Sequence, residues 1–61
     1  MEKFVLTPKE AAAYIGIGEN KIRDMCAARM IRATKVGRNW KIPRPMLERF
    51  IMEKAEKGET I

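Results

Sequence analysis

The stretch from Thr7 to Cys26, TPKEAAAYIGIGENKIRDMC, decides the fold, because it holds two short helical patterns separated by a glycine-containing turn. Its opening, Thr7-Pro8-Lys9-Glu10, predicts a helix that begins at Pro8, since threonine caps helices, proline fits the first turn and a glutamate three residues after the threonine completes a capping box. Gly16 can end this helix at little steric cost. Its apolar stripe consists of Ala11, Ala12 and Ile15.

A second amphipathic pattern follows the turn at residues 16–18. The run from Glu19 to Met30 is expected to form a helix with Gly18 as its N-cap, and Glu19 suits the positive end of the helix dipole. Its apolar face contains Ile22, Met25, Cys26 and Met30. The spacing small-x3-Gly-x5-aliphatic-x2-apolar, formed by Ala12, Gly16, Ile22 and Met25, allows close helix approach, a sharp turn and burial against the first helix, and so predicts a helix-turn-helix.

The rest of the chain predicts a β-hairpin and a third helix. Ile31 to Val36 is expected to be a strand, Gly37-Arg38-Asn39 a turn and Trp40-Lys41-Ile42 the return strand. Trp40 is expected to pack beneath the hairpin. Phe4 to Leu6 adds a third short strand. Pro43 and Pro45 end the hairpin and start a helix with the apolar stripe Leu47, Phe50, Ile51 and the stem of Lys54.

These elements predict an α+β fold, a small winged helix-turn-helix in which the hairpin is the wing. With 61 residues and 7.0 kDa, the chain has room for a single domain. We expect residues 1–61 to form that domain, with a core over residues 6–52 and a frayed tail at residues 53–61. A large enzyme framework with an enclosed active site is excluded by this length.

The residue types argue against chemistry at a catalytic or metal centre. The chain has one cysteine and no histidine, which excludes a disulfide framework and the usual zinc ligand sets within one chain. Cys26 falls on an apolar helix face with no base to activate it, so we expect a buried thiol rather than a nucleophile. We therefore expect no enzyme activity, metal, cofactor or small-molecule substrate. No apolar run is long enough to span a membrane, and a cytoplasmic location is expected.

Positive charge is concentrated in the middle of the chain. The formal net charge is +5, and the stretch from Glu19 to Arg44 alone carries eight basic residues and two acidic residues. One positive region on a small domain is typical of a nucleic-acid partner, although a solvated basic face is the simpler alternative.

Polar side chains gather at the start of the second helix, the part of a helix-turn-helix that enters the major groove. Arg23 can make the paired contact to guanine, Asn20 the paired contact to adenine, and Lys21 a base or phosphate contact. The expected recognition-helix contacts are Glu19, Asn20, Lys21, Arg23 and Asp24. The wing is expected to follow phosphates or enter the minor groove through Arg32, Lys35, Gly37, Arg38, Asn39 and Lys41. Alternatively, the helix residues are only the solvated side of a helix.

Three segments together resemble the excisionase-type winged helix-turn-helix family, a relative of MerR-like DNA-binding domains. They are Leu6-Thr7-x-x-Glu10-Ala11-Ala12-x-x-Ile15-Gly16-Ile17, Ile22-x-x-Met25 and Lys35-Val36-Gly37-Arg38-Asn39-Trp40-Lys41-Ile42-Pro43. Residues 17–23 are similar to excisionases of conjugative transposons. The family usually has Ser or Thr at the position of Gly18 and commonly Gly at the position of Arg29.

The resemblance implies a protein that binds double-stranded DNA beside the ends of a mobile element, bends it and helps a tyrosine recombinase, the integrase, to excise the element. It implies that helix two is the recognition helix and that Gly37, Arg38 and Asn39 form the wing. Further copies of the chain on the DNA are expected, and the location implied is the bacterial cytoplasm at the nucleoid. Two alternatives remain open: a small MerR-like transcription regulator, and a protein-interaction adaptor that uses the third helix and tail.

Overall fold

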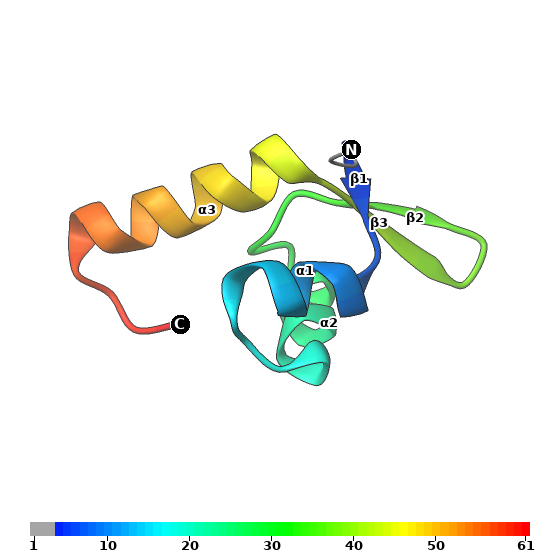
Figure 1. Cartoon of the computed structure of the whole chain (residues 1–61), viewed down its shortest axis with the longest axis horizontal. Helices are drawn as coiled ribbons and strands as arrows, with labels where there is room; N and C mark the ends of the chain where they lie inside the picture. Colours follow the sequence, from blue (N-terminus) through cyan, green and yellow to red (C-terminus); the bar gives the residue numbers. More distant parts are fainter. Residues whose placement is uncertain (1–3) are drawn as a thin grey trace.

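Three helices and a small antiparallel sheet make up the described part of the chain, residues 4–61, in the computed structural model (Figure 1). The strands lie in the order β1-β3-β2. The elements are β1 (Val5–Leu6), α1 (Pro8–Ile15), α2 (Glu19–Ala27), β2 (Thr34–Val36), β3 (Asn39–Pro43) and α3 (Arg44–Lys57). The α+β fold class predicted from the sequence is confirmed.

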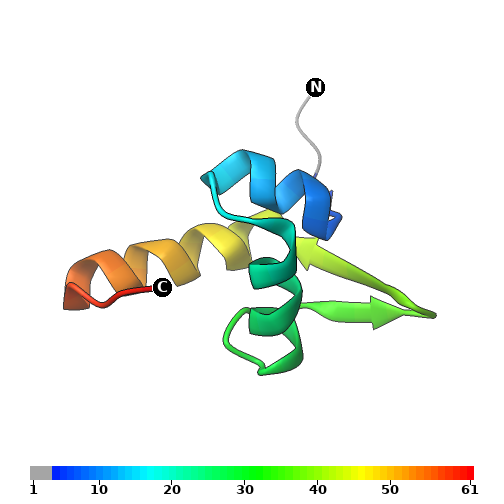
Figure 2. The same cartoon turned by 90° about the horizontal axis from the view of Figure 1, so that it is seen from below.

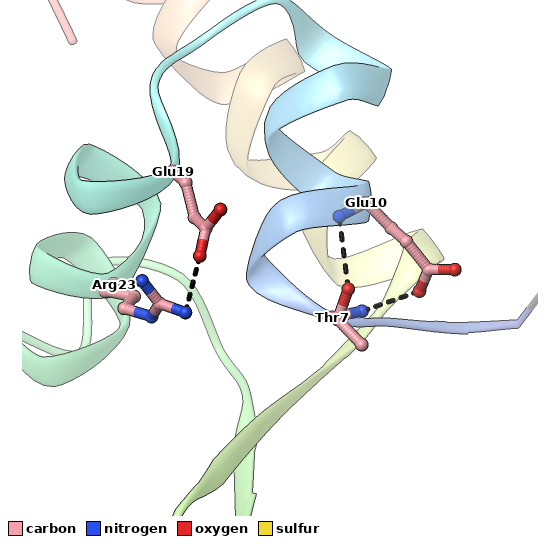
Figure 3. A network of polar contacts seen from close by, with 4 residues as sticks. All are labelled: Thr7, Glu10, Glu19 and Arg23. Atoms are coloured by element: carbon pink, nitrogen blue, oxygen red, sulfur yellow. Dashed lines mark hydrogen bonds and ion pairs between the residues drawn. The ribbon is translucent and has the colours of Figure 1, made fainter.

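The boundaries of α1 are those that the sequence predicts. The Glu10 N–H donates to Thr7 Oγ1 at 3.1 Å, and the Thr7 N–H donates to Glu10 Oε1 at 2.9 Å (Figure 3). These two hydrogen bonds form a capping box at the start of α1. At the other end, Gly16 has φ +71°, a left-handed conformation that only glycine adopts without penalty. The chain can therefore turn directly into α2.

The end of α2 differs from the prediction, because the helix stops at Ala27 rather than continuing to Met30. The Met30 N–H donates to the Met25 carbonyl at 2.9 Å and the Arg29 N–H to the Cys26 carbonyl at 3.0 Å, the bond pattern of a Schellman motif. Arg29 occupies the left-handed position of this motif, with φ +62°. Met30 is consequently exposed instead of completing the apolar face.

The central strand β3 pairs with β1 on one side and with β2 on the other, both antiparallel. Leu6 of β1 lies opposite Ile42, and Thr34 of β2 lies opposite Lys41. The first strand of the hairpin is shorter than the sequence predicts, because β2 begins at Thr34 rather than at Ile31. Ile31 instead lies in the loop before β2, and its side chain is buried in the core. The turn contains only Gly37 and Arg38, because Asn39 already pairs with Val36.

A single apolar cluster joins the sheet to all three helices. It consists of Leu6, Ala11, Ile22, Met25, Cys26, Ile31, Ile42, Leu47 and Phe50. Ala11 is fully buried, whereas Ala12 is only partly buried against the cluster. Cys26 is buried as predicted, and this burial raises the pKa of its thiol.

The C-terminal segment is more regular than the frayed tail expected from residue 53 onward. Helix α3 continues to Lys57, where Gly58 caps it in a left-handed conformation, and Lys54 Nζ contacts Glu59 Oε1 at 3.1 Å. Ile61 packs against the core cluster. Helix α3 is also tied to α1, because the Tyr14 hydroxyl donates to Glu48 Oε2 at 2.6 Å, and this bond raises the Tyr14 pKa.

Candidate nucleic-acid interface

Helix α2 and the hairpin formed by β2 and β3, called the wing from here on, present the predicted binding residues. The wing and α3 project in opposite directions from the α1–α2 pair (Figures 1 and 2). Helix α2 buries Ile22, Met25 and Cys26, so its opposite side is free of the core. Of the five residues predicted for the recognition helix, Asn20, Lys21, Arg23 and Asp24 are exposed, whereas Glu19 is half-buried because it lies three residues before Ile22 and seven before Cys26, at the margin of the core-facing side.

An ion pair organises one flank of α2. Arg23 Nη2 contacts Glu19 Oε2 one helical turn earlier, with 52% of the Arg23 side chain exposed (Figure 3). Glu19, Arg23 and Ala27 follow one another at i, i+4 and i+8, and therefore share this flank. Exposed pairs of this kind contribute about 0.3–0.5 kcal/mol, so Arg23 can exchange its carboxylate partner for another acceptor at little cost.

The wing separates the predicted basic residues between its two faces. Lys35 and Trp40 lie directly opposite each other, with Lys35 Nζ 5.5 Å from the centre of the Trp40 ring. Trp40 is half-buried and packs against the core, which confirms its predicted place beneath the wing. Because side chains alternate along a strand, Lys41 lies on the other face from Trp40. Arg38 is exposed in the turn.

The φ angles of the turn suit a tight hairpin. Gly37 has φ +63°, and Arg38 has a negative φ, the pattern of a type II′ turn with glycine at its first central position. Gly37 therefore shapes the wing through its backbone rather than by offering a side chain, and the turn places the Arg38 side chain at the tip.

Between the C-terminal half of α2 and the wing lies an open hollow of about 690 Å³, called the wing concavity from here on. Its lining residues are Cys26, Ala27, Arg29, Ile31, Arg32, Ala33, Lys35 and Trp40. It brings together Arg32 and Lys35 from the predicted set, whereas Arg38, Asn39 and Lys41 lie outside it. The sequence pattern predicts Arg29 inside the second helix and therefore does not assign it to the site. The signal that could have revealed its position is the glycine common there in the resembled family.

Two further features concern the described part of the chain, residues 4–61. Within that range, no group of three or more His, Cys, Asp or Glu side chains is placed to hold a metal ion. No helix of the described residues has the length and apolar character needed to cross a membrane.

The sheet, the three helices and the open side of α2 define a small winged helix-turn-helix protein. The model of the helix-turn-helix domain family matches residues 5–55, and the chain belongs to this family of DNA-binding domains. Neither the curated proteins nor the solved structures gave a match.

Proposed function

We propose that this protein is a sequence-specific, DNA-bending protein of excisionase type, which helps a tyrosine recombinase to excise a mobile element. Membership of the helix-turn-helix domain family supports the DNA-binding part of the proposal. The observation that carries it is the arrangement of α2 and the wing: α2 keeps its polar residues exposed, and a basic hairpin lies beside the C-terminal end of this helix, with Arg29, Arg32 and Lys35 lining the open concavity between them. The excision role rests on the resemblance of the three sequence segments described above.

In this proposal α2 lies in the major groove and its N-terminal turns read base edges. Arg23 donates to guanine and Asn20 makes the paired contact to adenine. Lys21 binds a base or a phosphate, and Glu19 and Asp24 can accept from the amino group of cytosine. Residues 1–61 act as one binding module.

The wing supports α2 from the flanking backbone. Arg32, Lys35, Arg38 and Lys41 supply positive charge, while Gly37 and Asn39 keep the turn narrow enough to approach phosphates or the minor groove. Such contacts carry affinity and register rather than sequence information.

The size of the module bears on how it works. The described residues span 33 × 28 × 17 Å, so one copy covers a short stretch of duplex. Single modules of this size bury a small interface, and we propose that several copies side by side, or an integrase partner, complete the specificity and bend the DNA.

Two experiments test this proposal, and both use a duplex that the protein has selected from a random-sequence pool. A circular-permutation assay measures bending, and a pull-down with the integrase encoded by the same element measures partner binding. Bending together with integrase capture supports the proposal. Specific binding without either result favours the transcription-regulator alternative, and salt-insensitive binding of a protein partner without duplex affinity favours the adaptor.

The matched control for the bending assay is Lys57→Ala. Lys57 is exposed in the last turn of α3, the helix that projects away from the wing (Figure 1). This substitution removes one positive charge while leaving α2 and the wing intact, so it should retain duplex binding and bending.

A further inference from the structure

Arg29 occupies a backbone conformation that is unfavourable for its residue type. Its φ of +62° places it in the left-handed region, and it is the one residue other than glycine with positive φ in the described chain. Glycine is the usual residue at this place of a Schellman motif, because a β-carbon crowds the backbone there. A positive charge beside the last carbonyls of α2 is favourable for the helix end, but a basic residue inside the last turn would supply it without strain, and retained strain is characteristic of functional positions.

Arg29 is exposed and lines the wing concavity together with two other cationic residues. Arg32 approaches from the loop and Lys35 from β2. Within residues 4–61, none of the three forms an ion pair, and no acidic residue lines the concavity. Lys35 Nζ lies 5.5 Å from the centre of the Trp40 ring, a contact that leaves its charge unneutralised, and all three cations are therefore available to an anion.

We propose that Arg29, with Arg32 and Lys35, binds a phosphate group of the DNA strand that passes between α2 and the wing. This inference rests on the proposed function, because it names a backbone contact of the same interface. A hollow of about 690 Å³ is much larger than one phosphate ion and open to solvent, whereas a sugar-phosphate segment can run through it. Ala27, on the flank of α2, is small enough to let that strand approach.

Arginine suits this contact better than lysine, since its planar guanidinium donates two parallel hydrogen bonds to one phosphate. The contact also fixes the register of α2, because a strand held at the C-terminal half of the helix limits how the N-terminal half can lie in the groove.

The decisive variant is Arg29→Gly, which removes the side chain and relieves the backbone at once. Its melting temperature should rise by about 4–8 °C. Its affinity for the selected duplex should nevertheless fall by about tenfold, and the slope of log K against log salt should become shallower by about 0.9. A more stable protein that binds DNA more weakly separates loss of a contact from loss of folding.

Two controls frame this result. Arg29→Lys keeps the charge and should retain most of the salt slope, and Lys57→Ala should keep both the affinity and the slope of the unmodified protein. Inorganic phosphate at matched ionic strength should leave the melting temperature unchanged. A saturable rise with phosphate alone, absent in Arg29→Gly, would reassign the concavity to a free anion and overturn the inference.

The remaining outcomes separate this inference from the proposed function. Affinity and salt slope of Arg29→Gly equal to those of the unmodified protein, with specific duplex binding intact, would overturn the phosphate contact and leave the proposed function standing. Failure of the unmodified protein to bind any duplex would overturn both.

Discussion

Glu19 is an acidic residue at the edge of the α2 surface that we assign to DNA, and it forms an ion pair with Arg23. Its carboxylate contacts the guanidinium along one flank of α2 and so favours one position of the Arg23 side chain by a small amount. The same charge repels phosphates, so Glu19 is expected to lower general affinity while it directs Arg23 toward a base.

Glu19→Gln should therefore raise affinity for a scrambled duplex by about two- to fivefold and reduce the preference for the selected site. Fluorescence anisotropy with both duplexes measures the two effects. Glu56→Gln, at an exposed position of α3, removes the same charge away from α2 and is the control. An equal change in preference in the two variants would argue against a specific role for Glu19.

Cys26 gives a residue-level prediction about the core. Burial raises its thiol pKa, so the folded state favours the protonated thiol. This contribution to stability is fully present below the unfolded thiol pKa of about 8.5, and it is lost as the pH rises through the higher folded value.

Iodoacetamide should accordingly label Cys26 only as fast as the chain unfolds, and Cys26→Ala should lose less stability between neutral and alkaline pH. Labelling followed by mass spectrometry, with denatured protein as the reference, measures the first effect, and thermal melts across this pH range measure the second. Labelling of the native protein at the rate of a free thiol would contradict the burial of Cys26 in the core.

At the scale of the elements, the two glycines of the turn between α1 and α2 have different roles. Gly16 needs its positive φ, whereas Gly18 has φ −62° and no side chain with which to cap α2. A β-carbon at Gly18 would meet no atom within 4 Å. Gly18 is therefore a site where stability can be gained.

Gly18→Ser should stabilise the protein by about 0.5–1 kcal/mol through a new cap and a less flexible unfolded chain. Gly16→Ala should destabilise it by about 1–2 kcal/mol, because alanine is strained at this φ. Urea unfolding followed by circular dichroism measures both. Equal effects of the two substitutions would contradict the assigned conformations.

Element starts were easier to predict than element ends. The start of α1 is encoded by local chemistry, the capping box of Thr7 and Glu10, so a short segment was enough to locate it. The end of α2 depends on Arg29 adopting a glycine-like conformation, for which the local residue type gives no signal. Ile31 has strand propensity but is drawn into the core from the loop before β2 by tertiary packing, which overrides local preference.

At the scale of the whole molecule, the concentration of positive charge between residues 19 and 44 indicates a basic surface. Only the folded structure shows which basic residues lie on the same face of the wing. Lys35 and Lys41 differ in face because of strand alternation, which the register at β3 fixes. The wing concavity could not be predicted, since it depends on where α2 ends and how the following loop returns to the sheet.

The number of phosphates contacted follows from the same surface. If about five lysine and arginine side chains neutralise phosphates, the logarithm of the DNA-binding constant K should fall with the logarithm of the salt concentration at a slope of about −4 to −5. Titrations of one duplex across a range of salt concentrations measure it. A slope near zero would contradict an electrostatic backbone interface.

The central claim is that α2 reads DNA sequence, and selection of bound duplexes from a random pool at near-physiological salt tests it most directly. Arg23→Ala and Arg38→Ala are selected in parallel. We predict an enriched motif that Arg23→Ala loses at specific positions and that Arg38→Ala keeps with weaker binding overall. The same motif from the unmodified protein and Arg23→Ala, or salt-sensitive retention of DNA with no motif at all, would contradict the assignment of α2 as the recognition helix.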